Sequence, residues 1–82
     1  MKQIVFHRRA VKDRRQVPSA ILQRIDAALA EYARGPEQAR NVRKLKGQDA
    51  LRLRVGDWRV IFRDGGDEII VQRIAHRREA YR

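Results

Sequence analysis

The segment LRLRVGDWRVIFR, residues 51–63, decides the fold of this chain. Apolar and basic residues alternate on both sides of Gly56-Asp57, which is the pattern of two strands joined by a tight turn. Glycine at the first central position suits a two-residue type II′ turn. The strands 51–55 and 58–63 then pair and share one apolar face, formed by Leu51, Leu53, Val55, Trp58, Val60 and Phe62.

The opposite face of the same hairpin is basic. The turn sets Arg54 directly across from Arg59, with Arg52 and Arg63 beside them. Like charges facing each other across a sheet are destabilising. Phosphate oxygens would offset this repulsion, because guanidinium groups donate charge-assisted hydrogen bonds to them. The alternative is that the arginines spread into solvent, where screening leaves little repulsion.

A helix is predicted over residues 18–34. Its apolar residues recur at helical spacing, Pro18 suits the first turn, and Gly35-Pro36 supplies the stop. The apolar stripe consists of Ile21, Leu22, Ile25, Ala28, Leu29 and Tyr32. We expect this stripe, Tyr32 included, to pack on the apolar face of the hairpin, and Trp58 to be a core residue rather than a platform for bases.

The remaining segments complete an α+β domain. Residues 3–7 read as a strand, and residues 7–17 as a short charged surface helix anchored by Ala10, Val11 and Val17. Residues 37–50 read as a polar connection without periodicity. The apolar run in residues 68–74 indicates a central strand, joined to the hairpin by a turn at Gly65-Gly66 and flanked by the N-terminal strand. The predicted order is β-α-α-β-β-β, with the two helices on a mainly antiparallel four-stranded sheet, in a single domain of residues 1–82.

Composition restricts the class of function. The chain has 82 residues and 20 Lys+Arg against 10 Asp+Glu, a net charge of +10, which favours polyanionic partners. It has no cysteine, so disulfides and thiolate metal sites are excluded. No segment has the length of a secretory signal or a membrane span, so we expect a soluble cytoplasmic protein without membrane contacts.

The C-terminal segment RIAHRREAYR, residues 73–82, gathers a second set of polar side chains directly after the central strand. They are Arg73, His76, Arg77, Arg78, Tyr81 and Arg82. A frayed, solvated terminus is the simpler interpretation. Surrounding arginines would, however, favour the phenolate of Tyr81, so this segment also offers a titratable partner for the basic strands.

The segments VRKLKG (residues 42–47), LRLRVGDWRVIF (51–62) and HRREAYR (76–82) together resemble the RelE/ParE toxin superfamily of bacterial type II toxin–antitoxin systems. The resemblance covers essentially the whole chain. It implies a small RelE-like α+β toxin encoded beside its antitoxin. RelE-like members are ribosome-dependent endoribonucleases that cut mRNA in the A site, whereas ParE-like members share the fold and poison DNA gyrase.

The resemblance also implies functional residues. The basic residues that RelE-like toxins carry on their second and third strands correspond here to Arg52, Arg54 and Arg59, and their C-terminal arginine and tyrosine to Arg77 and Tyr81. Arginine stands where relatives can have lysine; it stays protonated and cannot act as a base. His76, Arg77 and Arg78 are alternatives for one position. The expected RNA contacts are Lys44, Lys46, Arg52, Arg63, Arg73, His76 and Arg78.

The expected chemistry is RNA cleavage without metal or other cofactor, by attack of the 2′-hydroxyl on the adjacent phosphate. It needs a base, charge stabilisation and an acid for the leaving oxygen. Tyr81 is the candidate base, Arg54 and Arg59 would hold the phosphate, and Arg77 or His76 would assist the leaving group.

Two alternatives remain open from sequence alone. A ParE-like toxin that inhibits DNA gyrase would share the fold and the charge. A stand-alone DNA-binding module is disfavoured, because no recognition-helix pattern is visible. In the toxin interpretation the partners are an acidic or amphipathic antitoxin, mRNA and the ribosome, and DNA is bound only through the antitoxin complex.

Overall fold

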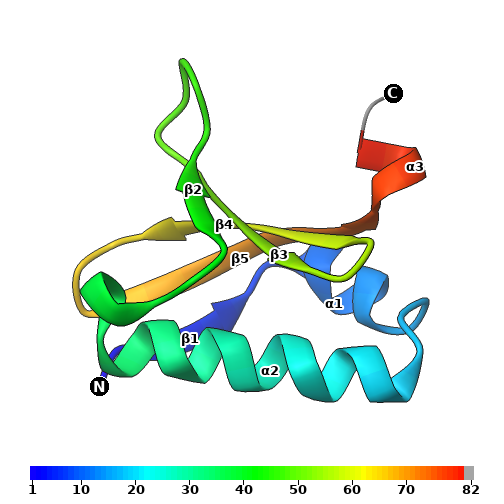
Figure 1. Ribbon diagram of the computed structural model, residues 1–82, viewed down its shortest axis with the longest axis horizontal. Helices are drawn as coiled ribbons and strands as arrows, with labels where there is room; N and C mark the ends of the chain where they lie inside the picture. The colour runs from blue at the N-terminus through cyan, green and yellow to red at the C-terminus, as the bar shows by residue number, and fades with distance from the viewer. Residues whose placement is uncertain (81–82) are drawn as a thin grey trace.

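The computed structural model describes residues 1–80, apart from the side chains of Gln38 and Ala80. One five-stranded sheet has the order β1-β5-β4-β3-β2, and α2 lies across one of its faces (Figure 1). The elements along the chain are β1 Gln3–Phe6, α1 Arg8–Arg14, α2 Ser19–Arg34, the 3-10 turn η1 Pro36–Gln38, β2 Val42–Lys44, β3 Leu51–Val55, β4 Trp58–Asp64, β5 Glu68–His76 and α3 Arg77–Ala80. The predicted α+β class is confirmed.

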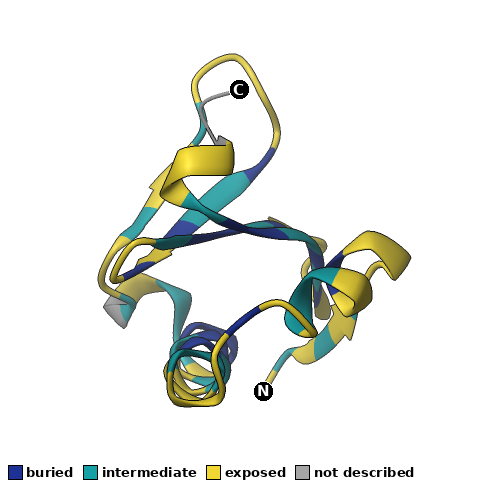
Figure 2. Cartoon of the chain, turned by 90° about the vertical axis from the view of Figure 1, so that its right-hand side faces the viewer, coloured by how far each residue is buried: buried dark blue, intermediate teal, exposed yellow. Residues whose placement is uncertain are grey.

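The core lies between α2 and the sheet (Figure 2). Helix α2 buries Ile25, Leu29, Tyr32 and Ala33, so the apolar stripe predicted for residues 18–34 faces the sheet. The six apolar residues of the β3–β4 hairpin either belong to this core or pack against it. Trp58 is half-buried at its edge, in agreement with its prediction as a core residue.

Strand β1 pairs with β5, as predicted for the N-terminal strand, and the two strands run parallel. The sheet is therefore mixed. Helix α1 follows β1 and buries Ala10, but Val11 is 43% exposed, so the prediction that Val11 anchors this helix was wrong. Its last turn is held instead by Arg14, whose guanidinium lies 4.6 Å from the centre of the Phe6 ring and pairs with Asp26 on α2.

Strand β2 is the main difference from the predicted fold, which had four strands. Residues 37–50 were expected to be a connection, yet Val42–Lys44 pairs antiparallel with β3. Asn41 enters the strand with a φ of 63° and accepts a hydrogen bond from Arg54 N–H at 3.0 Å. A strand of three residues at a sheet edge is too short to show an alternating pattern, so its formation depends on the edge of β3.

The first hairpin turn lies where it was predicted, and the second is one residue later. Gly56 has a φ of 57°, a conformation that favours glycine, and Val55 pairs with Trp58. In the second hairpin Gly65 N–H donates to Glu68 O at 2.8 Å, so the central residues are Gly66-Asp67 rather than Gly65-Gly66. This moves the pairing of β4 and β5 by two residues, and a shift of two residues by itself does not change the face of any side chain.

A β-bulge then changes the faces of β5. Phe62 pairs with Val71, but Ile61 pairs with Arg73, so Gln72 is the extra residue on β5. As a result Ile74 is buried in the core and Arg73 points to the other side of the sheet. No helix among the described residues is long and apolar enough to cross a membrane.

Candidate functional site

The arginines of four neighbouring strands gather on the side of the sheet opposite α2. The registers place Arg43 across from Arg52, and Arg54 across from Arg59, as predicted for the second pair. Ile61 lies between Arg52 and Arg73, and Ala75 lies beside Arg59. We name this surface the arginine face and define it by its basic residues, which are Arg43, Arg52, Arg54, Arg59 and Arg73.

Exposure differs strongly across the arginine face. Arg43 and Arg54 are exposed and Arg52 is half-buried, whereas Arg59 is only 5% exposed. The Nε atom of Arg52 is buried without a hydrogen-bond partner in the described part of the chain. Among residues 1–80, none of the observed ion pairs involves Arg43, Arg52 or Arg54. The positive charge of these side chains is therefore available to a bound anion.

Arg73 is held differently, by a carboxylate at the edge of the sheet. Its Nε donates to Asp13 Oδ2 at 3.2 Å, and the same oxygen accepts from Ile74 N–H at 2.9 Å. The Asp13 side chain on α1 is only 12% exposed, so this pair is partly shielded from solvent. Arg73 thus lies on the arginine face with its charge already offset.

The C-terminal segment begins beside the β3–β4 turn. Arg77 N–H donates to Asp57 O at 2.7 Å, and its Nη1 lies 3.7 Å from Asp57 Oδ1. This places Arg77 at the end of the sheet where the Arg54–Arg59 pair lies. Tyr81, the candidate base, lies outside the described residues, as does Arg82.

His76 faces the other side of the sheet from the arginines. It pairs with Trp58, and the two rings meet edge to face with centroids 5.3 Å apart. Its Nδ1 accepts from Arg78 N–H at 3.3 Å, which fixes the start of α3. The geometry therefore gives His76 a packing and capping position on the helix side of the sheet, while Arg77 lies beside Asp57 at the end of the β3–β4 hairpin.

The basic residues predicted around β2 are divided between the two faces. Lys44 pairs with Leu51 and lies on the helix side of the sheet, while Arg43, which sequence reasoning missed, lies on the arginine face. Lys46 is exposed in the β2–β3 loop. This loop and α3 both extend from the sheet on the side opposite α2 (Figures 1 and 2). Arg63 is exposed on the arginine side but lies farther along β4, opposite Ile70.

A second polar group lies at the other end of the molecule, and we name it the Asp64 cluster: Lys2, Tyr32, Asp64 and Gly66. Asp64 accepts from Tyr32 Oη at 2.7 Å, from Lys2 Nζ at 3.0 Å and from Gly66 N–H at 2.9 Å. Burial and this hydrogen bond raise the pKa of Tyr32 to about 12, which makes its hydroxyl a poor base. Burial alone would raise the pKa of Asp64, but its hydrogen bonds outweigh burial and lower it.

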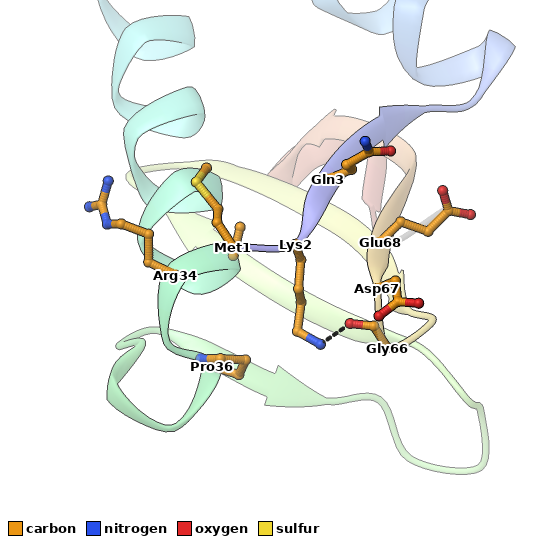
Figure 3. Close-up of a pocket in the computed structure, with 9 residues that line it drawn as sticks. Met1, Lys2, Gln3, Arg34, Pro36, Gly66, Asp67 and Glu68 are labelled. Carbon is orange, nitrogen blue, oxygen red and sulfur yellow. Dashed lines mark hydrogen bonds between the residues drawn. The ribbon is translucent and has the colours of Figure 1, made fainter.

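The Asp64 cluster borders a cleft of about 620 Å³ between the start of β1, the end of α2 and the β4–β5 turn. Figure 3 shows Lys2 reaching across this cleft to the carbonyl of Gly66. Its lining mixes both signs of charge, with Arg34 opposite Asp67 and Glu68. The cleft thus lacks the excess positive charge of the arginine face.

The arginine face can stabilise anions but cannot move protons by itself. Guanidinium groups stay protonated and donate several hydrogen bonds in a fixed plane, a geometry that matches phosphate. Residues 1–80 contain no group of three or more His, Asp or Glu side chains arranged to hold a metal ion. The arrangement is therefore suited to binding a phosphodiester and stabilising negative charge that develops on it.

Comparisons with known proteins agree with these features. Residues 4–81 match the family described as the ParE toxin of type II toxin–antitoxin systems, parDE. Toxin RelE3 of Methanocaldococcus jannaschii is 32% identical over 82 residues, which cover 95% of this chain and 93% of that protein. Two solved structures have similar folds. One is the RelB–RelE antitoxin–toxin complex from Methanococcus jannaschii (TM-score 0.78, 31% identity, 94% of each chain covered), and the other is the archaeal RelE–RelB complex from Pyrococcus horikoshii OT3 (TM-score 0.76, 25% identity, 93% of this chain and 94% of that one).

The fold and the basic sheet face thus define a small α+β protein of the RelE-like structural class. Because the family match extends over nearly the whole chain, the chain belongs to the ParE toxin family of type II toxin–antitoxin systems. It is a toxin of the RelE type, as its identity to Toxin RelE3 indicates. The superfamily inferred from the sequence segments is confirmed.

Proposed function

We propose that this toxin is a ribosome-dependent endoribonuclease that cleaves mRNA and thereby inhibits translation. The observation that carries the proposal is the register of β3 and β4, which sets Arg54 directly across from Arg59 on the arginine face. Arg77 lies at the same end of the sheet, next to Asp57. An anionic substrate that bridges such a pair offsets its repulsion.

In the proposed reaction, Tyr81 takes the proton of the 2′-hydroxyl, whose oxygen attacks the adjacent phosphorus. Arg54 and Arg59 stabilise the charge that develops on the phosphate oxygens, and Arg77 stabilises the departing 5′-oxygen. The bond from phosphorus to this oxygen breaks, and a proton from solvent water gives the 5′-hydroxyl beside a 2′,3′-cyclic phosphate. No step requires a metal ion.

The test is primer extension on mRNA from translating ribosomes incubated with purified protein. Arg54→Ala should slow cleavage about 100-fold, the size of effect expected when one preorganised donor to a developing charge is removed. Tyr81→Phe should abolish cleavage while binding to ribosomes persists. Arg34→Ala, at the end of α2, is the control with the same loss of charge. Unchanged cleavage by Tyr81→Phe would rule out the assigned base.

A second candidate function follows from the family match, whose description names the ParE toxin. A ParE-like toxin would inhibit DNA gyrase without chemistry of its own. A supercoiling assay with purified gyrase, run beside the primer extension, separates the two functions. Inhibition of supercoiling without mRNA cuts would favour this alternative.

We further propose a cognate antitoxin as the physiological partner, because both relatives compared above were solved with RelB bound. The net charge of +10 favours an acidic segment in that partner. Coexpression with the product of the adjacent gene should yield a copurifying complex without cleavage activity. A partner that binds but leaves cleavage unchanged would contradict this role.

A further inference from the structure

Both histidines of the chain stand in the same short sequence, His-Arg-Arg, at the start of a helix. At α1, His7 Nδ1 accepts from Arg9 N–H at 3.3 Å. At α3, His76 Nδ1 accepts from Arg78 N–H, also at 3.3 Å. A ring nitrogen can accept only while it carries no proton, because both nitrogens of a charged imidazolium are donors. Each of these hydrogen bonds therefore requires a neutral histidine.

The two histidines differ in their surroundings. His7 is exposed, and the helix that it caps has no part in the proposed reaction. His76 is half-buried, and its ring meets the edge of Trp58 with centroids 5.3 Å apart and an interplanar angle of 89°. Trp58 is the single tryptophan of the sequence. His76 is thus fixed by the sheet on one side and holds the start of α3 on the other.

The start of α3 is attached to the sheet through two successive backbone N–H groups. Arg77 N–H donates to Asp57 O in the β3–β4 turn at 2.7 Å, and Arg78 N–H donates to His76. A helix of four residues is too short to be stable by itself, so these two bonds determine the direction in which the chain leaves β5. The same segment carries Arg77, and Tyr81 follows it in the sequence.

Protonation of His76 would add a cation where positive charge already prevails. The charged groups of the neighbouring elements are Asp57 of the β3–β4 turn, Arg77, Arg78 and Glu79 of α3, Arg24 of α2, whose Nη1 lies near Gly56, and Asp13 and Arg14 of α1, which already pair with Arg73 and Asp26. Arg59 and Arg73 lie on the opposite side of the sheet. None of the ion pairs observed among residues 1–80 involves His76.

We propose that His76 is a positioning residue whose neutral form fixes the start of α3 and, with it, Arg77 and the C-terminal segment. Protonation removes the acceptor of Arg78 N–H and releases this segment. The toxin then loses cleavage activity as the pH falls from about pH 8 to about pH 5, the range in which histidine changes its charge. The activity part of this inference rests on the proposed endoribonuclease function.

The first test needs no ribosome. A protonated imidazole quenches the fluorescence of an indole in contact with it, so Trp58 emission should fall in one step between about pH 8 and about pH 5. The protection of Arg78 N–H against hydrogen exchange should be lost over the same range. His76→Asn should show neither change, because an asparagine side chain accepts from the N–H two residues on at any pH. His7→Asn, the matched control, should show both.

The second test measures single-turnover mRNA cleavage at saturating ribosomes. Because a tyrosine base has a pH dependence of its own, each variant is compared with the wild type at the same pH. Between about pH 7.5 and about pH 5.5, the wild-type rate should fall about tenfold more than that of His76→Asn, the factor expected for one lost hydrogen bond. His76→Leu, which can still pack on the indole but has no acceptor, should be about tenfold slower than His76→Asn at pH 7.5. His7→Asn should follow the wild type.

The outcomes separate the inference from the function beneath it. Equal pH responses of the wild type and His76→Asn overturn the inference, as does loss of the response in His7→Asn instead. A fluorescence step without loss of protection at Arg78 also overturns it, because the ring would then titrate without releasing α3. If the wild type cuts no mRNA at either pH, the proposed function fails, and hydrogen exchange alone decides whether His76 fixes α3. Thermal melts at both pH values serve as the folding control for each variant.

Discussion

The arginine face and the Asp64 cluster both contain charged side chains, but only in the Asp64 cluster is a charge paired with hydrogen-bond donors, whereas the arginine face sets like charges opposite each other. In the Asp64 cluster, one carboxylate accepts hydrogen bonds from a hydroxyl, an ammonium and a backbone N–H. On the arginine face, Arg43 is set against Arg52, and Arg54 against Arg59. The first arrangement stabilises the fold, since every polar group has a partner. The second stabilises the fold less than an oppositely charged pair would, and under the proposed function a bound phosphate would offset its repulsion.

The largest expected effect on stability comes from Asp64→Ala. It leaves the Tyr32 hydroxyl and Lys2 without their acceptor, so the free energy of unfolding should fall by about 2 kcal/mol. Tyr32→Phe, which removes only one of these hydrogen bonds, should cost about 1 kcal/mol. Urea denaturation measures both, and the double variant should lose less than the sum of the two. A strictly additive result would show that the cluster does not act as one network.

A smaller decrease in the free energy of unfolding is expected when the pH is lowered. The pKa of Asp64 is lower in the folded chain than in the unfolded chain, so its contribution is present at neutral pH and is lost as the pH falls through the folded pKa. The free energy of unfolding should therefore decrease from about pH 5 to about pH 3 in the wild type, and less steeply in Asp64→Asn. Equal slopes in the two proteins would contradict a stabilising role of the ionised carboxylate.

The smallest effect on stability is expected from Arg54→Glu, and its sign is opposite. It replaces a like-charged pair with an attractive one against Arg59, so the free energy of unfolding should rise by about 0.2–1 kcal/mol. The same variant should lose mRNA cleavage, because the phosphate would meet a carboxylate. Arg54→Gln, which only removes the repulsion, should fall between the two in stability. A less stable Arg54→Glu would mean that Arg54 is needed for the fold.

The pairing of Arg54 with Arg59 could be predicted from sequence, because it depends only on neighbouring residues. Alternation along residues 51–63 and a two-residue turn at Gly56 were enough to place Arg54 across from Arg59. Arg43 could not be found in this way, since a three-residue strand has no period and forms only where the edge of β3 is available. The only sequence signal was that Val42 and Arg43 continue the apolar and basic alternation of the strand they pair with.

The β-bulge shows a second limit of pattern reasoning. Strict alternation from Ile69 and Val71 would place Arg73 in the core and Ile74 outside. The observed faces are reversed, because Gln72 is the extra residue between Val71 and Arg73. The only sign of this bulge in the sequence is the spacing of the core residues, which is two residues from Ile69 to Val71 and three from Val71 to Ile74.

The catalytic assignment of Tyr81 stays a prediction, since this residue lies outside the described ones.

The carboxylate of Asp13 has a consequence for how the chain avoids association with copies of itself. Strand β1 ends at Phe6, so among the described residues no strand lies beside β5 on that side beyond Val71. Backbone donors on an uncovered strand are a template on which another chain can add a strand and start aggregation. By accepting from Ile74 N–H, Asp13 occupies the donor that such an intruding strand would use. One side chain from α1 thus satisfies a backbone donor that would otherwise need a longer β1 as its partner.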